Sequence, residues 1–309
     1  TDTPHVLLQS GRRIPLRRSG DLLYLDFLVP TSPSRTVDTA VHADFIASER
    51  PTYVVDICAG TSSSLQYHAH NPLAKLMAID ILEPSDFRRL LPKHLRSRVT
   101  YVQLDVKYLT NSTYKRILRD VWGIAPRDVQ HVHYSPMCDT LSTADRDRFR
   151  HFDKHGRPRS DKAKEHMACL RQVLTTLSSS HKDPARTLIT CENPVGRFRK
   201  LDIVQRTAAL PGWHLHDRAD HCSMRTSIDK QLYPKKPTTW LTFGDMPSLG
   251  LLPRCGKSCG CLIPGTDRHK FVICSNPNMH PQQQKIHNVF AKGRIPLGAF
   301  ERFYHAFRP

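Results

Sequence analysis

The sequence lacks three features that mark common protein classes. It contains no run of about 18 apolar residues, so we expect no membrane-spanning helix. No secretory signal opens the chain, which begins at Thr1 and is consistent with a domain excised from a longer polypeptide. The patterns Gly-x-Gly-x-x-Gly and Gly-x-x-x-x-Gly-Lys are also missing, which argues against dinucleotides and nucleoside triphosphates as ligands.

Acidic residues are scarce relative to basic ones. The 309 residues include 46 Lys and Arg against 28 Asp and Glu, a net charge of +18. Such an excess usually indicates a polyanionic partner, most often nucleic acid. A basic surface without a partner, or a basic patch that meets anionic lipid, are the alternatives. The length suits one large domain, or a main domain with a small satellite.

The nine cysteines are distributed unevenly. Without a secretory signal we expect an intracellular, reducing compartment, where thiols serve catalysis or metals more often than disulfides. Some cysteines are scattered and others cluster near the end of the chain, which suggests two separate roles. The scattered ones are Cys58, Cys138, Cys169, Cys191 and Cys222, and the clustered ones are Cys255, Cys259, Cys261 and Cys274.

Strand-like and helix-like patterns alternate through the middle of the chain. This alternation predicts an α/β fold with a largely parallel sheet that is covered on both faces. The expected strands lie at 53–57, 76–79 and 99–104, and then around 131–132 and 188–189. The expected helices cover 85–91, 111–122 and 162–177. After Trp213 the pattern gives way to an irregular segment rich in Pro, Cys, His and Lys, before a closing helix at 296–307.

Acidic residues end the first three expected strands. Asp56 precedes the tight turn Ala59-Gly60-Thr61, where backbone N–H groups suit an anionic or carboxylate ligand. Asp80 ends the second strand, a place where an acid commonly receives the two hydroxyls of a ribose. Asp105 ends the third strand, where it could meet an adenine amino group. Three acids on one sheet edge indicate an adenosine with a short amino-acid tail, and S-adenosylmethionine fits best.

The next two strands end in chemically active side chains. His133-Tyr134-Ser135-Pro136-Met137-Cys138 brings a thiol to the rim of the sheet, and Glu192-Asn193-Pro194 brings a carboxylate beside it. A nucleophilic sulfur and a proton-donating acid are what addition to a pyrimidine ring requires. Free cysteine is often only a small buried apolar group, but a core residue gains little at a turn after proline.

A strongly basic segment follows the Cys138 turn. Residues 145–164 include Arg146, Arg148 and Arg150 among eight Lys and Arg. A charge run of this kind is usually a solvated loop. Its position directly after the thiol suggests a mobile flap that closes over a phosphate backbone.

The order of these motifs resembles the cytosine-C5 DNA methyltransferases, and most closely their compact, phage- and mobile-element-type branch. The motifs are Asp56-Ile-Cys-Ala-Gly-Thr61, Asp80, Asp105, Ser135-Pro-Met-Cys138 and Glu192-Asn-Pro194. Tyr233-Pro-Lys-Lys-Pro-Thr-Thr-Trp240, the Cys-rich stretch from Cys255, and Arg294-Ile-Pro-Leu297 extend the likeness over roughly residues 50–309. The motif order is far more specific than any single motif.

This resemblance implies a division of the chain. Residues 1–45 would be an N-terminal extension, and 46–215 a Rossmann-like catalytic core that binds S-adenosylmethionine. Residues 216–290 would form a small irregular, Cys-rich target-recognition-like module, and 291–309 a closing helix packed on the core. The implied cofactor-binding residues are Asp56, Ala59, Gly60, Thr61, Asp80, Asp105 and Ser135.

The resemblance also implies a mechanism on a cytosine flipped out of double-stranded DNA. The Cys138 thiolate would add to C6, and Glu192 would hydrogen-bond the ring at N3 and the amino group. Arg225, Lys235 or Lys236 could hold the cytosine carbonyl or a phosphate, and Arg146, Arg148 and Arg150 could bind the DNA backbone. We expect a monomer, located in the nucleus of a eukaryote or in the host cytoplasm if the protein is phage-derived.

Departures from the family pattern keep other functions open. The usual Pro-Pro-Cys is Ser-Pro-Met-Cys here, the turn lacks the family's second glycine, and Asp139 would tend to raise the pKa of Cys138. These departures favour a slow enzyme or a catalytically silent nucleic-acid-binding module. An RNA cytosine-C5 methyltransferase that uses Cys191 is another alternative. An amino-methyltransferase would need an aromatic residue at position 138.

The clustered cysteines have the composition of a zinc site. Structural zinc takes four tetrahedral ligands from Cys and His. The candidate ligands are Cys255, Cys259, Cys261, His269 and Cys274. The spacing is not a pair of Cys-x2-Cys knuckles, so several reduced cysteines in an irregular loop are the alternative. Bound zinc would stabilise a module that is too small to build its own core.

Overall fold

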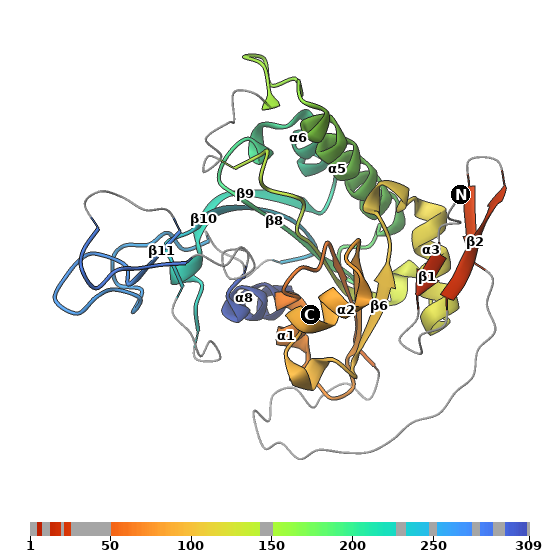
Figure 1. The fold of residues 1–309 in the computed structure, drawn as a ribbon, viewed down its shortest axis with the longest axis horizontal. Coiled ribbons are helices and arrows are strands. Elements are labelled where there is room, and N and C mark those ends of the chain that lie inside the picture. The colour runs from red at the N-terminus through yellow and green to blue at the C-terminus, as the bar shows by residue number, and fades with distance from the viewer. Residues whose placement is uncertain are drawn as a thin grey trace.

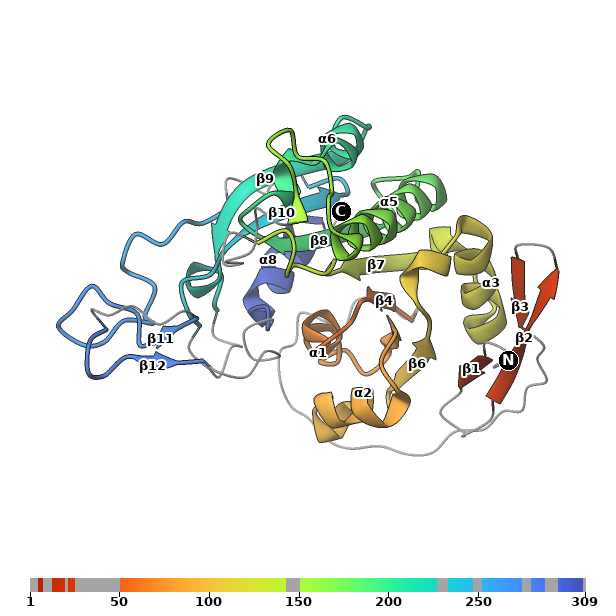
Figure 2. The same cartoon turned by 45° about the horizontal axis from the view of Figure 1, so that its top comes forward.

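The computed structural model describes residues 51–142, 151–226, 233–246, 252–273, 279–286 and 294–307, and the backbone of three N-terminal strands. These strands form an antiparallel sheet in the order β1-β2-β3. Their bounds are β1 (His5–Leu7), β2 (Arg13–Ser19) and β3 (Leu22–Leu25). The small sheet lies near α3 (Asn111–Trp122), at the β6 end of the molecule (Figures 1 and 2).

A seven-stranded sheet forms the centre of the molecule, with the strand order β6-β5-β4-β7-β8-β10-β9. The first five strands run parallel, and β10 runs antiparallel to both of its neighbours. The strands are β4 (Tyr53–Ile57), β5 (Lys75–Asp80), β6 (Val99–Gln103), β7 (Val129–Tyr134), β8 (Leu188–Pro194), β9 (Trp213–Asp220) and β10 (Pro237–Phe243). The order of the strands reverses beside β4, so β4 and β7 flank a topological switch point.

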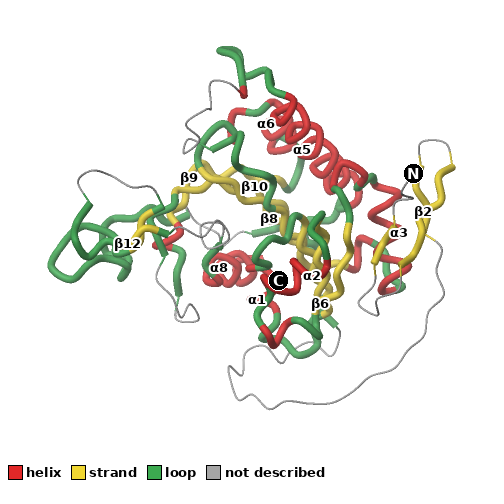
Figure 3. The backbone as a smooth tube through the Cα atoms, in the orientation of Figure 1, coloured by secondary structure: helices red, strands yellow, loops and turns green. Residues whose placement is uncertain are grey.

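Helices cover both faces of this sheet (Figures 1 and 3). They are α1 (Ser63–His68), α2 (Pro84–Leu90), α3, α5 (Asp161–Ser180), α6 (Asp202–Ala208) and α8 (Leu297–Phe307). Short 3₁₀ helices connect them: η2 (Lys93–Leu95), η3 (Val106–Tyr108), η4 (Pro126–Asp128), η5 (Phe198–Lys200) and η6 (His221–Ser223). Two short parallel strands, β11 (Phe271–Val272) and β12 (Gln284–Lys285), lie apart from the main sheet.

Successive side chains of β4 pack into the hydrophobic cores on opposite faces of the sheet. Val55 and Ile57 pack with α3, α5 and α6, whereas Val54 packs with α1 and α2 on the opposite face. Successive side chains of a strand point to opposite faces, so a strand buried on both faces is apolar at almost every position. A third cluster joins α8 to the sheet through Trp240, Phe300 and Phe303.

The α/β fold class predicted from the sequence is confirmed: the sheet is mostly parallel, covered on both faces and Rossmann-like. The helix expected at 296–307 is α8. Residues 216–220 of β9 and all of β10 pair within the main sheet, although the sequence suggested a separate module from residue 216 onward. Long-range pairing with β8 places them there, and a local pattern does not reveal such pairing.

Candidate active site

A cavity of about 920 Å³ opens at the carboxyl ends of β4, β7 and β8. Its walls come from the turn after β4, the loop after β7, the end of β8, the start of β10 and the segment around β11. Among the sequence-predicted site residues, the cavity is lined by Asp56, Ala59, Gly60, Thr61, Ser135, Cys138, Glu192, Lys235, Lys236 and His269. Asp80, Asp105 and Arg225 are not among its lining residues.

The turn after β4 has an unusual backbone. Cys58, Gly60 and Ser62 all have positive φ values, of 54°, 47° and 51°. Such values cost little for glycine but strain the other two residues. The Asp80 carboxylate holds the turn, because its Oδ2 accepts a hydrogen bond from the Gly60 N–H at 3.1 Å. Asp80 thus lies directly behind the turn that faces the cavity.

Asp56 is a buried acid with one oxygen unpaired among the described residues. Its Oδ2 accepts a hydrogen bond from Ser64 Oγ at 2.6 Å, while Oδ1 is buried with no hydrogen-bond partner. Burial raises the pKa of Asp56 well above its usual value, and the Asp80 charge adds to this effect. A cationic ligand group at Oδ1 would supply the missing partner.

Asp105 has a local structural role in this fold. Its Oδ1 accepts from the Lys107 N–H at 3.0 Å and so caps η3, and its Oδ2 pairs with Lys107 Nζ at 2.7 Å. The three predicted acids nevertheless gather around one point. Burial raises the pKa of Cys58, and Asp80, Asp56 and Asp105 each raise it further.

Two hydrogen bonds to backbone carbonyl groups fix the loop that carries Cys138. The Ser135 N–H donates to Ile57 O at 3.2 Å, and Asn193 Nδ2 donates to Pro136 O at 3.1 Å. Asn193 therefore couples the end of β8 to the Ser-Pro-Met-Cys loop. Cys138 itself is exposed on the cavity wall.

The surroundings of Cys138 disfavour its thiolate. Partial removal of water in the concave wall raises the pKa of Cys138, and the Glu192 and Asp139 charges act in the same direction. Lys236 opposes them. The negative charge of Asp139 is itself partly balanced, because its carboxylate pairs with Lys162 and lies 3.2 Å from His166 Nδ1.

Glu192 is a buried carboxylate held by two basic side chains. Lys236 Nζ donates to Glu192 Oε1 at 3.1 Å, and His221 Nε2 lies 3.4 Å from the same oxygen. Burial alone would raise the pKa of Glu192, but Lys236 and His221 outweigh it and lower the pKa to about 2. Glu192 is therefore ionised at neutral pH in this arrangement.

Cys191 lies on the other side of β8. It pairs with Tyr134 across the parallel strands, and its side chain is fully buried in the core. Burial raises the pKa of Cys191 well above its usual value. Because Cys191 does not line the cavity, this geometry argues against the RNA-type alternative that needs it as the nucleophile.

A chain of buried hydrogen bonds reaches the cavity through Ser135. His68 Nε2 lies 2.7 Å from His131 Nδ1, and His131 Nε2 lies 2.8 Å from Thr190 Oγ1. Thr190 Oγ1 also lies 2.9 Å from His133 Nδ1, and His133 Nε2 lies 2.8 Å from Ser135 Oγ. Burial lowers the pKa of all three histidines, to about 3 for His68 and about 4 for His133.

Basic side chains line a second cavity of about 690 Å³, which shares Ser142 with the first. Its Lys and Arg residues are Lys154, Arg157, Arg171, Arg197 and Lys200. Three predicted DNA-binding residues, Arg146, Arg148 and Arg150, lie outside the described residues. Part of the predicted basic flap, at 151–160, does contribute to this cavity.

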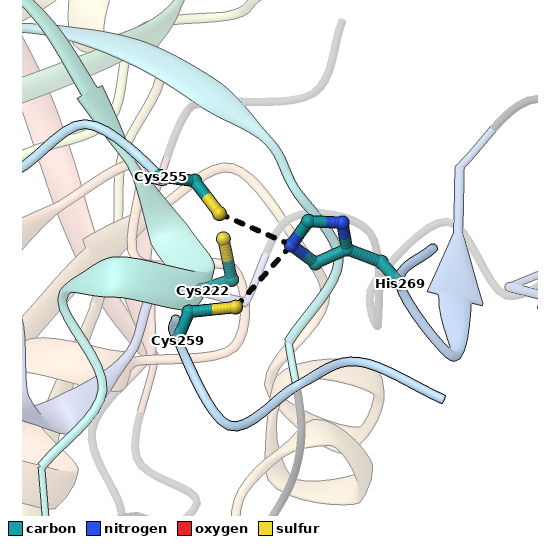
Figure 4. A group of neighbouring side chains, drawn as sticks. All are labelled: Cys222, Cys255, Cys259 and His269. Carbon is teal, nitrogen blue, oxygen red and sulfur yellow. Dashed lines mark hydrogen bonds between the residues drawn. The ribbon is translucent and has the colours of Figure 1, made fainter. Parts of the chain in front are cut away.

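Figure 4 shows four side chains of types that can bind a metal and that point toward one another: Cys222, Cys255, Cys259 and His269. Of these, His269 also lines the first cavity. Their ligand atoms all lie within 4.8 Å of one another. Cys255, Cys259 and His269 were predicted from the sequence. Cys261 is instead buried with its sulfur 4.0 Å from Cys222 O, and Cys274 lies outside the described residues. The fourth member is Cys222, which joins the cluster from the far end of β9.

Sequence reasoning missed several residues that build these sites. His133 and Arg268 line the first cavity, and Cys222 belongs to the cysteine and histidine cluster. The others are His221 and Asn193, which contact Glu192 and the Cys138 loop. The Asn193 contact was open to prediction, because Asn directly follows Glu192 at a strand end. His221 and Cys222 depend on the pairing of β9 with β10, which brings them to Lys236 and to the Cys255 loop.

No protein-family model and no curated protein matches the chain. Similar solved structures include an Escherichia coli prophage protein assigned as a DNA modification methyltransferase, with 15% identity and a TM-score of 0.38 over 62% of this chain and 46% of that one. The chain thus spans less than half the length of that protein. A second is a precorrin-6y C5,15-methyltransferase from Geobacter metallireducens, with 12% identity and a TM-score of 0.32 over 63% of this chain and 80% of that one. A third is a human methyltransferase 10 domain containing protein, with 9% identity and a TM-score of 0.37 over 65% of this chain and 75% of that one. All three carry methyltransferase names, but likenesses this distant give no evidence about substrate.

None of the helices in the described part of the chain is long and apolar enough to cross a membrane.

Proposed function

We propose that the chain is an S-adenosylmethionine-dependent DNA cytosine-C5 methyltransferase. The observation that carries the proposal is that Cys138 and Glu192 line one cavity together with Asp56 and the turn after β4. A nucleophile, an acid and a candidate cofactor site thus share one space at the carboxyl edge of the sheet, where α/β folds bind their ligands.

The cavity residues fit S-adenosylmethionine. The unpaired Asp56 Oδ1 is a buried acceptor for the ammonium group of an amino-acid tail. Asp80, the residue expected to receive ribose hydroxyls, holds this turn from behind through the Gly60 N–H and does not itself line the cavity. When bound, S-adenosylmethionine supplies an electrophilic methyl group attached to a sulfonium.

The Glu192–Lys236 pair complements the edge of a flipped cytosine. The ionised carboxylate accepts hydrogen bonds, as the exocyclic amino group of the base requires, and the Lys236 ammonium donates to N3 or O2. The Cys138 thiolate would bond through sulfur to C6, which moves electron density to C5, so that C5 could displace the methyl group from the sulfonium and leave a neutral thioether. Loss of the C5 proton to water would then restore the C5–C6 double bond and release Cys138 as a thiolate.

Double-stranded DNA is the proposed partner. The lysines and arginines of the second cavity lie beside the Cys138 loop, where they would contact phosphates that flank the flipped base. The described stretches 252–273 and 279–286, where a target-reading module is expected, contribute Arg268, His269 and Gln283 to the wall of the first cavity. The division into a core at 46–215, a module at 216–290 and a closing helix at 291–309 also belongs to this proposal, except that β9 and β10 are part of the core sheet.

A catalytically silent nucleic-acid-binding module is a second candidate. Two observations favour it: the pKa of Cys138 is raised, and Glu192 is ionised rather than ready to donate a proton. Both features slow the addition step.

Product analysis tests the proposed function. The protein is incubated with S-adenosylmethionine and duplex DNA of varied sequence, and the nucleosides are separated and identified by mass spectrometry. We expect 5-methylcytosine from the native protein and none from Cys138→Ser, with Cys191→Ser as the matched control that retains activity. Methylation at N4, methylation of RNA alone, or DNA binding without any methylated product would contradict the proposal.

A further inference from the structure

We infer that Cys222, Cys255, Cys259 and His269 form a structural zinc site that fastens the 252–273 segment to the end of β9. The four residues come from three separate places in the chain: η6, the loop at 252–260, and the stretch before β11 (Figure 4). Three sulfurs and one imidazole nitrogen are a ligand set that zinc prefers in closed structural sites.

The distances match a zinc-bound tetrahedron. Cys255 Sγ lies 3.4 Å and Cys259 Sγ 3.3 Å from His269 Nε2. Bonds of about 2.3 Å to sulfur and about 2.0 Å to nitrogen place S and N about 3.5 Å apart at tetrahedral angles. All four ligand atoms lie within 4.8 Å of one another, which brings them within reach of a single zinc ion.

Hydrogen bonding alone accounts poorly for this convergence. An imidazole nitrogen carries either one N–H or one lone pair, so His269 Nε2 forms one good hydrogen bond within the ring plane. Two sulfurs nevertheless approach it at nearly the same distance. The sulfur of Cys222 also lies within 4.8 Å of those of Cys255 and Cys259. A cation shared by thiolates explains all of these contacts together.

Backbone groups around the cluster suit thiolate ligands. The backbone N–H groups of Lys257 and Cys261 lie close to the sulfurs of Cys255 and Cys259, respectively. Lys257 and Gly260 have positive φ values, of 67° and 69°, which tighten the loop after each cysteine. Amide donors to metal-bound sulfur are part of the outer shell that orients the ligands.

The site would hold one wall of the catalytic cavity. His269 itself lines the cavity, and Cys222 directly follows His221, whose ring lies 3.4 Å from Glu192. Asp220 adds a second link, because its Oδ2 accepts from the Cys255 N–H at 2.8 Å. The 252–273 segment has only two short strands nearby and few buried apolar residues, so a metal supplies stability that a core does not.

Metal content and cobalt spectra test this inference without reference to activity. We expect one zinc per chain by mass spectrometry of the purified protein. Cobalt added to the metal-free protein should give the intense absorption of a tetrahedral thiolate site. Cys222→Ser and Cys255→Ser should each lower the zinc content several-fold, whereas Cys261→Ala, the neighbouring cysteine outside the cluster, should retain it.

Cys222→His tests whether Cys222→Ser loses zinc only because the variant fails to fold. It keeps a ligand at this position, so zinc should be retained with a changed cobalt spectrum. Native protein with no zinc and no cobalt spectrum would overturn the inference, as would a Cys222→Ser variant that binds zinc as tightly as the native chain. Zinc binding without methyl transfer would leave this inference intact and would count against the proposed function alone.

Discussion

The Glu192 carboxylate depends on its two basic neighbours. It is almost fully buried, and desolvation of an unpaired charge would be costly. Lys236 and His221 keep its pKa near 2, so the ionised form persists where a neutral acid would otherwise be favoured. The same pairing explains why Lys236, which was predicted only as a contact to the base or to a phosphate, is buried.

Substitution of Lys236 by Met tests this pairing. Removing one partner of a buried ion pair destabilises proteins by about 3–5 kcal/mol, so we expect a loss in that range at pH 7 by urea denaturation. In the native protein the lowered pKa of Glu192 gives stability that is present above pH 4.5 and is lost as the pH falls toward 2. In the variant the pKa is raised, and the destabilisation should shrink as the pH falls toward about 4.

Lys235→Met is the matched control, since Lys235 lines the same cavity without an ion pair to Glu192 among the described contacts. It should change stability by less than about 1 kcal/mol. Equal effects of the two substitutions, or no dependence on pH, would contradict the electrostatic role given to Lys236.

The strands β7 and β8 are joined by polar contacts within an otherwise apolar sheet. Thr190 on β8 hydrogen-bonds to two histidines of β7, and His68 extends the chain to α1. The buried histidines are neutral in the fold, while an unfolded chain takes up protons below pH 6.5. Stability should therefore fall as the pH drops from 6.5 toward 4.

Thr190→Val should break this chain at its centre. Valine has the same shape but leaves a nitrogen of His131 and one of His133 without a partner, at about 1–3 kcal/mol each. We expect a loss of about 2–6 kcal/mol in thermal or urea unfolding. Thr239→Val on β10 removes a single hydrogen bond to Asp217 O and should cost about 1 kcal/mol. A Thr190 variant no less stable than the control would refute the importance of the chain.

Elements that depend on local sequence were predictable, and contacts between distant elements were not. Apolar periodicity located β4 to β8 and the helices α2, α3 and α5, because each signal lies within one segment. The same reasoning predicted that Asp105 binds a ligand. In the structure Asp105 instead caps η3, where it accepts a hydrogen bond from the Lys107 N–H and pairs with the Lys107 ammonium group. Cys222 was set apart from the cysteine cluster because only the β9–β10 pairing brings it there.

The charge of +18 is partly concentrated beside the first cavity. Five Lys and Arg side chains line the second cavity, two of them from the basic segment 145–164, and Arg146, Arg148 and Arg150 of that segment lie outside the described residues. Binding of such residues to phosphates releases counterions, so DNA affinity should decrease steeply with salt.

Lys154→Ala and Arg157→Ala should weaken DNA binding at all sequences to a similar degree. Removal of one phosphate-binding charge should reduce the slope of log affinity against log salt by about 1. Fluorescence anisotropy at several salt concentrations measures this slope. Lys93→Ala, an exposed lysine in η2 on the other face of the sheet, should leave the slope unchanged, and equal slopes for all three variants would rule out a phosphate-binding role for the second cavity.

Trapping of the covalent intermediate is the sharpest test of Cys138 as the nucleophile that attacks cytosine. Native protein, Cys138→Ala and Cys191→Ala are incubated with S-adenosylmethionine and duplex DNA that contains 5-fluorocytosine, whose fluorine blocks the final elimination. We expect a denaturation-resistant adduct that is lost only in Cys138→Ala. An adduct lost only in Cys191→Ala, or DNA binding without any adduct on varied sequences, would contradict this role of Cys138.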